Sequence, residues 1–156
     1  MVNPSKGVRL GVDVGSVRIG ISRCDQDQIM AMPVATLNAS ENNINEVISF
    51  AQEFGAQLIY VGKPISLNEN VTSSTLLAEE FANRLAMQWE QPVRLLDERL
   101  TTVSATNTLQ VNGKNSKEGR SIIDQVAAVI LLDHALAIEK SLGDFAGQVV
   151  KSPEDK

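Results

Sequence analysis

An isolated carboxylate inside an apolar run is the feature that most constrains this chain. Asp13 lies within residues 10–15, whose other members are aliphatic residues and glycines, and a second largely apolar run follows at residues 18–22. Two such runs joined by a short turn predict a β-hairpin, with Asp13 near the end of the first strand. An unpaired charge in a buried strand is unfavourable, so we interpret Asp13 as a ligand for a metal ion.

Composition is typical of a single globular domain. A chain of 156 residues with 43% hydrophobic residues can bury its own core. The one cysteine cannot form an internal disulfide, and we find neither a signal-peptide pattern nor an apolar run of membrane-spanning length. We therefore expect a cytoplasmic protein with no membrane partner. The net charge of −5 argues against binding nucleic acid through bulk charge, but bound divalent cations would offset it locally.

The pattern of apolar residues predicts an α/β fold. Strands are expected at residues 7–15, 19–24, 29–37, 57–61 and 93–96. Amphipathic helices are expected at residues 41–54, 72–89, 102–109 and 121–142. This order predicts a mixed five-stranded sheet, an antiparallel meander plus parallel strands, flanked by helices. Pro33 indicates that the third strand lies at an edge of the sheet.

We expect one domain over residues 1–146, followed by a disordered tail at residues 147–156. The segment 112–120 is polar and basic and contains two glycines. Such a composition predicts a mobile loop before the last helix.

Two further acids lie where they could reach Asp13. Glu98 follows the strand at 93–96, and Asp124 lies in the first turn of the last predicted helix. Strand ends and helix starts meet at one edge of an α/β sheet, so carboxylates far apart in sequence converge there. Carboxylates with open coordination positions suit Mg²⁺ or Mn²⁺. Two ions about 3.5–4 Å apart would support hydrolysis of a phosphodiester bond.

Three blocks of sequence carry a resemblance to a known family. They are residues 11–20, 97–102 and 123–128, and Val-Gly-Lys-Pro at residues 61–64 lies between them. Over nearly its whole length the chain resembles the YqgF/RuvX family. The resemblance implies a ribonuclease H-like nuclease domain whose metal-binding catalytic acids are Asp13, Glu98 and Asp124. Lys63 departs from the family, which usually has an apolar residue between this glycine and proline.

The same motifs contain basic and hydroxyl side chains that are candidates for substrate contacts. These residues are Arg18, Arg99, Thr101 and Thr102. Arg99 could instead pair with a neighbouring acid at the surface, where such a pair contributes about 0–1 kcal/mol. The polar segment adds three basic residues, which either bind phosphates or are simply solvated: Lys114, Lys117 and Arg120.

The substrate follows from the resemblance and not from the residues themselves. The resemblance favours a role in processing the 5′ end of precursor 16S rRNA. We expect the protein to be a monomer or a weak homodimer. A Holliday junction resolvase, which cuts branched DNA as a dimer, is the alternative within the same class of enzyme. A non-catalytic RNA-binding module with the same fold is a third hypothesis. An actin/Hsp70-type nucleotide-binding fold also has Asp-x-Gly in its first hairpin, but it needs two such hairpins and we find no second copy.

Overall fold

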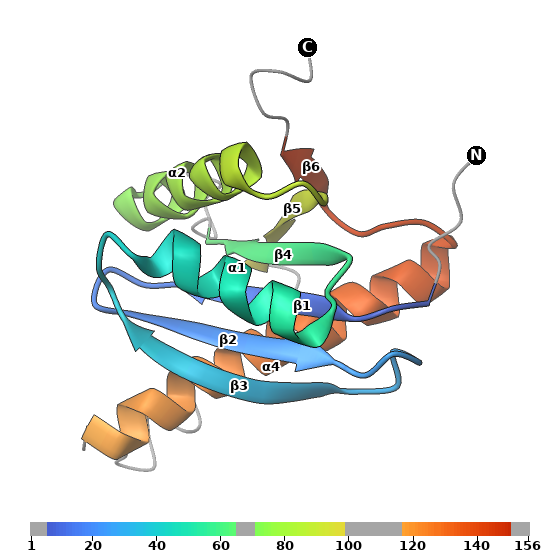
Figure 1. The fold of residues 1–156 in the computed structure, drawn as a ribbon, viewed down its shortest axis with the longest axis horizontal. Coiled ribbons are helices and arrows are strands. Elements are labelled where there is room, and N and C mark those ends of the chain that lie inside the picture. The colour runs from blue at the N-terminus through green and yellow to red at the C-terminus, as the bar shows by residue number, and fades with distance from the viewer. Residues whose placement is uncertain (1–5, 65–70, 99–116, 151–156) are drawn as a thin grey trace.

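A six-stranded mixed sheet forms the centre of the fold (Figure 1). The computed structural model describes residues 6–64, 71–98 and 117–150. The strands are β1 Arg9–Val14, β2 Arg18–Cys24, β3 Ala31–Asn38, β4 Leu58–Lys63, β5 Val93–Asp97 and β6 Gln148–Val150. Their order across the sheet is β3-β2-β1-β4-β5-β6, in which β1, β4 and β5 are parallel and the other neighbours pair antiparallel.

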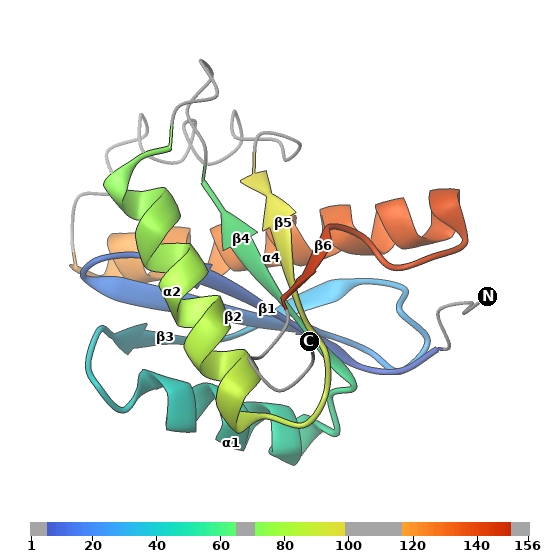
Figure 2. The ribbon, with the colours of Figure 1, turned by 90° about the horizontal axis from the view of Figure 1, so that it is seen from above.

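Helices cover both faces of this sheet (Figure 2). Helices α1, Asn43–Phe54, and α2, Ser73–Gln88, lie on one face, and the long helix α4, Lys117–Leu142, lies on the other. Alternate residues of the central strands supply the two cores. Val12 of β1 packs with α1 and α2, and Tyr60 of β4 packs with α4. Because side chains alternate along a strand, Asp13 lies on the α4 face.

The ends of α1 and α2 follow from local sequence. Gly55 terminates α1 with φ of 67°, a conformation that glycine adopts without steric cost. Thr72 caps α2 in a reciprocal pair with Thr75, where each side-chain oxygen accepts from the other residue's backbone N–H, at 3.2 and 3.0 Å. Among the described residues, we find no helix that is both long and apolar enough to span a bilayer.

The expected architecture is confirmed, with β3 at an edge as Pro33 indicated, but the strand count of five was wrong. The sixth strand lies in the segment expected to be a disordered tail, so that prediction was wrong for residues Gln148–Val150. Three residues are too short for a periodic pattern, and β6 depends on a distant side chain. Arg94 of β5 donates from Nε to the carbonyl of Ala146 at 2.5 Å and from a terminal nitrogen to that of Gly147 at 2.9 Å.

The prediction of a loop at residues 112–120 was also wrong for its last four residues, because α4 begins at Lys117. Gly119 suggested a loop, but one glycine in a helix costs only about 1 kcal/mol relative to alanine. Its neighbours Lys117, Glu118 and Arg120 favour helix. The helix expected at residues 102–109, the first part of the expected loop and the end of the expected tail lie outside the described residues.

A buried polar network, absent from our sequence interpretation, connects α4 to the sheet. Arg9 of β1 donates to both carboxylate oxygens of Glu139 on α4, at 3.3 and 3.2 Å. The hydroxyl of Tyr60 on β4 donates to the same carboxylate at 2.5 Å, and it accepts from the backbone N–H of Ala146 at 3.1 Å. Each buried polar group therefore has a partner, as stability in a dry core requires.

Candidate active site

Asp13 and Glu98 come into direct contact at one end of the sheet. Asp13 is the penultimate residue of β1, and Glu98 follows the last residue of β5. Strand β4 separates these strands, and its Gly62 makes the contact possible, since a Cβ atom there would collide with Oε1 of Glu98. The missing side chain lets Glu98 reach across β4, and the two carboxyl groups form a hydrogen bond.

Both of these carboxyl groups have raised pKa values. Burial is the largest cause of the rise in the pKa of Asp13, and the charge of Asp124 adds to it, while the hydrogen bond from Glu98 acts in the opposite direction. Burial, then the charge of Asp13 and the hydrogen bond to it, raise the pKa of Glu98 to about 9. Glu98 therefore keeps its proton at neutral pH and donates a hydrogen bond to Asp13. A divalent cation would remove the repulsion that keeps this proton in place.

Asp124 reaches the pair because α4 packs very closely on β2. Gly20 is the cross-strand partner of Asp13, and a Cβ atom on it would overlap the backbone carbonyl of Asp124. One turn further along α4, the hydroxyl of Ser22 donates to the carbonyl of Ala128 at 2.7 Å. Small residues on both the strand and the helix thus bring this part of α4 onto the sheet, where Asp124 raises the pKa of Asp13. The prediction that Asp124 lies in the first turn of this helix was wrong, because α4 begins at Lys117, about two turns earlier. The contribution of Gly20 was missing from our sequence interpretation.

Arg18, one of the predicted substrate contacts, pairs with Asp124 in this structure. Its Nε atom lies 2.6 Å from Oδ2 of Asp124, and the two side chains are 27% and 21% exposed. One carboxylate oxygen of Asp124 is therefore engaged by a guanidinium. The pair lies beside the Asp13–Glu98 contact, so the site contains three acidic side chains and one arginine.

The residues present fit a divalent metal ion. Asp13, Glu98 and Asp124 supply the carboxylate oxygens that Mg²⁺ and Mn²⁺ prefer. In residues 6–64, 71–98 and 117–150, however, no three acidic, histidine or cysteine side chains are already oriented around one metal position. The donors are gathered, but Asp124 faces Arg18 and Glu98 faces Asp13. An ion bound here would take the place of Arg18 beside Asp124 and of the proton between Glu98 and Asp13.

The other predicted substrate contacts have different outcomes. Arg99, Thr101, Thr102 and Lys114 lie outside the described residues. Lys117 and Arg120 lie in the first two turns of α4, at the same end of that helix as Asp124, and only their backbone is described.

Lys63, where the chain departs from the family pattern, points away from the acids. Its Nζ atom lies 3.1 Å from a carboxylate oxygen of Glu79 on α2. Alternation along β4 places Lys63 on the opposite face from Gly62. The extra positive charge is thus neutralised by α2 and does not enter the acidic site.

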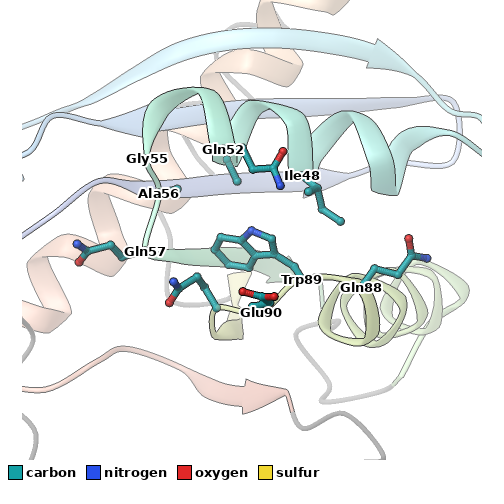
Figure 3. Close-up of a pocket in the computed structure, with 10 residues that line it drawn as sticks. Ile48, Gln52, Gly55, Ala56, Gln57, Gln88, Trp89 and Glu90 are labelled. Carbon is teal, nitrogen blue, oxygen red and sulfur yellow. The ribbon is translucent and has the colours of Figure 1, made fainter.

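A cavity of about 460 Å³ lies at the opposite end of the sheet and is separate from the acidic site. It opens where α1 and α2 end, beside Trp89 (Figure 3). Glutamine residues line the cavity together with Trp89: Gln52, Gln57, Gln88 and Gln91. None of the predicted site residues that the structure describes lines this cavity.

Solved structures share the fold. RuvC of Thermus thermophilus bound to a Holliday junction substrate superposes with a TM-score of 0.57 at 16% identity, covering 92% of this chain and 99% of that chain. A second structure of Thermus thermophilus RuvC gives a TM-score of 0.51 at 15% identity, over 86% and 96% of the two chains. The expected ribonuclease H-like fold is thereby confirmed.

Sequence relatives extend over almost the whole chain. A protein of Clavibacter michiganensis subsp. michiganensis, named "Putative pre-16S rRNA nuclease", is 44% identical over 147 residues, which cover 92% of this chain and 91% of the relative. A protein of Leifsonia xyli subsp. xyli with the same name is 42% identical over 150 residues, covering 93% and 95%. The family model described as RuvX, Holliday junction resolvase, matches residues 7–138. A match of this extent, with this identity to its relatives, shows that the chain belongs to the RuvX family.

Proposed function

We propose that this protein is a metal-dependent nuclease that hydrolyses phosphodiester bonds at the acidic site. The observation that carries this proposal is the convergence of Asp13, Glu98 and Asp124 from three separate elements onto one end of the sheet. An acid pair that retains a proton because it is buried and because its charges repel one another is suited to bind a divalent cation. The names of the RuvX relatives support nuclease chemistry.

Each acid has a distinct part in the proposed site. Asp13 contacts Glu98 and feels the charge of Asp124, so it would be the acid that two bound ions share. Glu98 has to lose its proton, and its hydrogen bond to Asp13, before it binds metal. Asp124 completes the donor set from α4. When bound, Mg²⁺ or Mn²⁺ would activate a water molecule and stabilise the leaving oxygen.

We propose precursor 16S rRNA as the substrate, with cleavage during maturation of its 5′ end. The names of relatives at 44% and 42% identity support this choice. Basic and hydroxyl side chains would hold the phosphate backbone, as phosphate contacts do in nucleic-acid complexes generally. The proposed contacts are Arg18, Arg99, Thr101, Thr102, Lys114, Lys117 and Arg120.

Resolution of Holliday junctions is the second candidate, and the family description and the likeness to RuvC favour it. Symmetric cleavage of a junction requires two active sites and hence a dimer, whereas processing of one RNA strand can be done by a monomer. We propose a cytoplasmic protein that is a monomer or a weak homodimer, which suits RNA processing better. Sedimentation at working concentration, with and without a junction, separates the two.

The test is a cleavage assay on two substrates, a precursor 16S rRNA 5′ fragment and a four-way DNA junction, with Mg²⁺ or Mn²⁺. We expect Asp13→Asn to lower the cleavage rate by about 100-fold or more, the usual loss when one preorganised stabilising group is removed. Asp27→Asn is the matched control, because Asp27 is an exposed aspartate on the loop after β2. Failure of the wild type to cut either substrate, or full activity of Asp13→Asn, would contradict the proposal and leave a non-catalytic RNA-binding module.

A further inference from the structure

The ion pair between Arg18 and Asp124 is imposed by the fold and is not an incidental surface contact. Arg18 and Gly20 lie two positions apart on β2, so both face α4. The backbone of Asp124 sits directly over Gly20, and this places its carboxylate beside the side chain of Arg18. The resulting distance of 2.6 Å is that of a charge-assisted hydrogen bond.

This ion pair engages a carboxylate that the proposed metal site needs. Oδ2 of Asp124 already accepts a hydrogen bond from Nε of Arg18. A divalent cation bound among Asp13, Glu98 and Asp124 would lie within a few ångströms of the guanidinium, and two positive charges at that separation repel each other strongly in a partly buried site. Binding of the cation to Asp124 should therefore weaken its ion pair with Arg18.

We propose that Arg18 competes with the divalent cation for Asp124. Arg18 neutralises Asp124 in the metal-free protein, and it must release that carboxylate when the ion binds. The inference rests on the proposed function, because it concerns the same metal site. It also gives Arg18 a second partner, since a released guanidinium at the edge of the site matches the geometry of a phosphate group.

The exchange has a thermodynamic consequence that does not depend on catalysis. Breaking the Arg18–Asp124 ion pair costs free energy, which reduces the affinity for the ion. Removal of Arg18 should therefore strengthen ion binding. Coupling between two binding events in a protein commonly changes an affinity by about 5- to 150-fold, and we take the lower end as the expected gain. If Arg18 instead held Asp124 in the orientation that the ion needs, its removal would weaken binding.

The experiment is calorimetric titration of Mn²⁺ into the full-length protein without nucleic acid. We expect Arg18→Ala to lower the dissociation constant by about fivefold or more, and Arg18→Gln, which keeps a polar side chain, to change it in the same direction. Arg23→Ala is the matched control. It removes one positive charge from the same strand, but Arg23 packs its guanidinium over the ring of Phe54 at 4.5 Å. This control should bind Mn²⁺ as the wild type does.

A double-mutant cycle separates competition from simple removal of charge. In an Asp124→Asn background the competition is absent, so adding Arg18→Ala should have little effect on Mn²⁺ binding. An equal gain in both backgrounds, no gain, or a loss in Arg18→Ala would each overturn the inference. These results would leave the proposed nuclease intact as long as the wild type binds Mn²⁺. Absence of Mn²⁺ binding in every variant would instead overturn the proposed metal site, and the competition with it.

Discussion

Among the described residues, two arginine–carboxylate pairs join α4 to the sheet, and they differ in their contact with solvent. Arg9 and Glu139 form a pair whose side chains are 1% and 3% exposed, whereas those of Arg18 and Asp124 are 27% and 21% exposed. The two acids are fifteen positions apart on α4, which is about 22 Å along a helix. The same chemical pairing thus occurs in two environments within one packing interface.

Because of this difference in exposure, we assign a structural role to the Arg9–Glu139 pair and treat the Arg18–Asp124 pair as one whose partners can be exchanged. Glu139 also accepts a hydrogen bond from Tyr60. The pair is enclosed by α4 and the sheet, so neither side chain can exchange its partner for water. Removing one partner from such a pair leaves a buried, uncompensated charge. Asp124 and Arg18 are within reach of water, and each has a proposed alternative partner, a cation and a phosphate. A pair at the surface contributes little to stability, and it can be exchanged at little cost.

The largest effect is expected from Glu139→Ala. The substitution strands Arg9 in the core and removes the acceptor of the Tyr60 hydroxyl, so the free energy of unfolding should fall by about 3–5 kcal/mol. Urea unfolding followed by circular dichroism measures it. Glu53→Ala, an exposed position on α1, is the matched control and should change little. A loss below about 1 kcal/mol for Glu139→Ala would mean that the two pairs do not differ as their exposure suggests.

An intermediate effect is expected from the pH dependence of the metal-free protein. The pKa of Glu98 rises from its usual 4.5 to about 9 in the folded state. Its contribution to stability is then complete below about pH 4.5 and is lost as the pH rises through about 9. Unfolding measured in a metal chelator should show stability declining over this window, and Glu98→Gln should flatten the decline. Glu80→Gln, an exposed position on α2, should leave it unchanged. Equal slopes for wild type and Glu98→Gln would refute the shared proton.

The smallest effect on stability is expected from Asp124→Ala. Arg18 is already partly hydrated and Asp13 is relieved of a neighbouring charge, so the free energy of unfolding should change by less than about 1 kcal/mol. Cleavage should nevertheless be lost, because a proposed metal ligand is gone. Thermal unfolding and the two-substrate assay, run on one preparation, give both values. A large loss of stability here would make Arg18–Asp124 a structural pair like Arg9–Glu139.

Much of the fold could be predicted from the sequence because its signals are local. The alternation of apolar residues identified the hairpin of β1 and β2, Pro33 marked β3 as an edge, and Gly55 marked the end of α1. Asp13, Glu98 and Asp124 could be named as candidates because Asp13 is a carboxylate near the end of an apolar strand, Glu98 follows another strand and Asp124 precedes the apolar part of a helix. The approach of Asp13 and Glu98 agrees with the rule that strand ends at one edge converge.

Sequence by itself determined which apolar faces of the helices and strands are buried and which acids lie near one edge of the sheet, since periodicity reports the face of an element. Only the tertiary structure decided which distant side chains share space. Arg18 meets Asp124 across 106 positions, and Arg9 meets Glu139 across 130. Both contacts depend on how closely α4 packs against the strands, and Gly20 sets that closeness at the acidic end. Local patterns carry no information about such spacing, so the partners of these four charges became visible only in the folded chain.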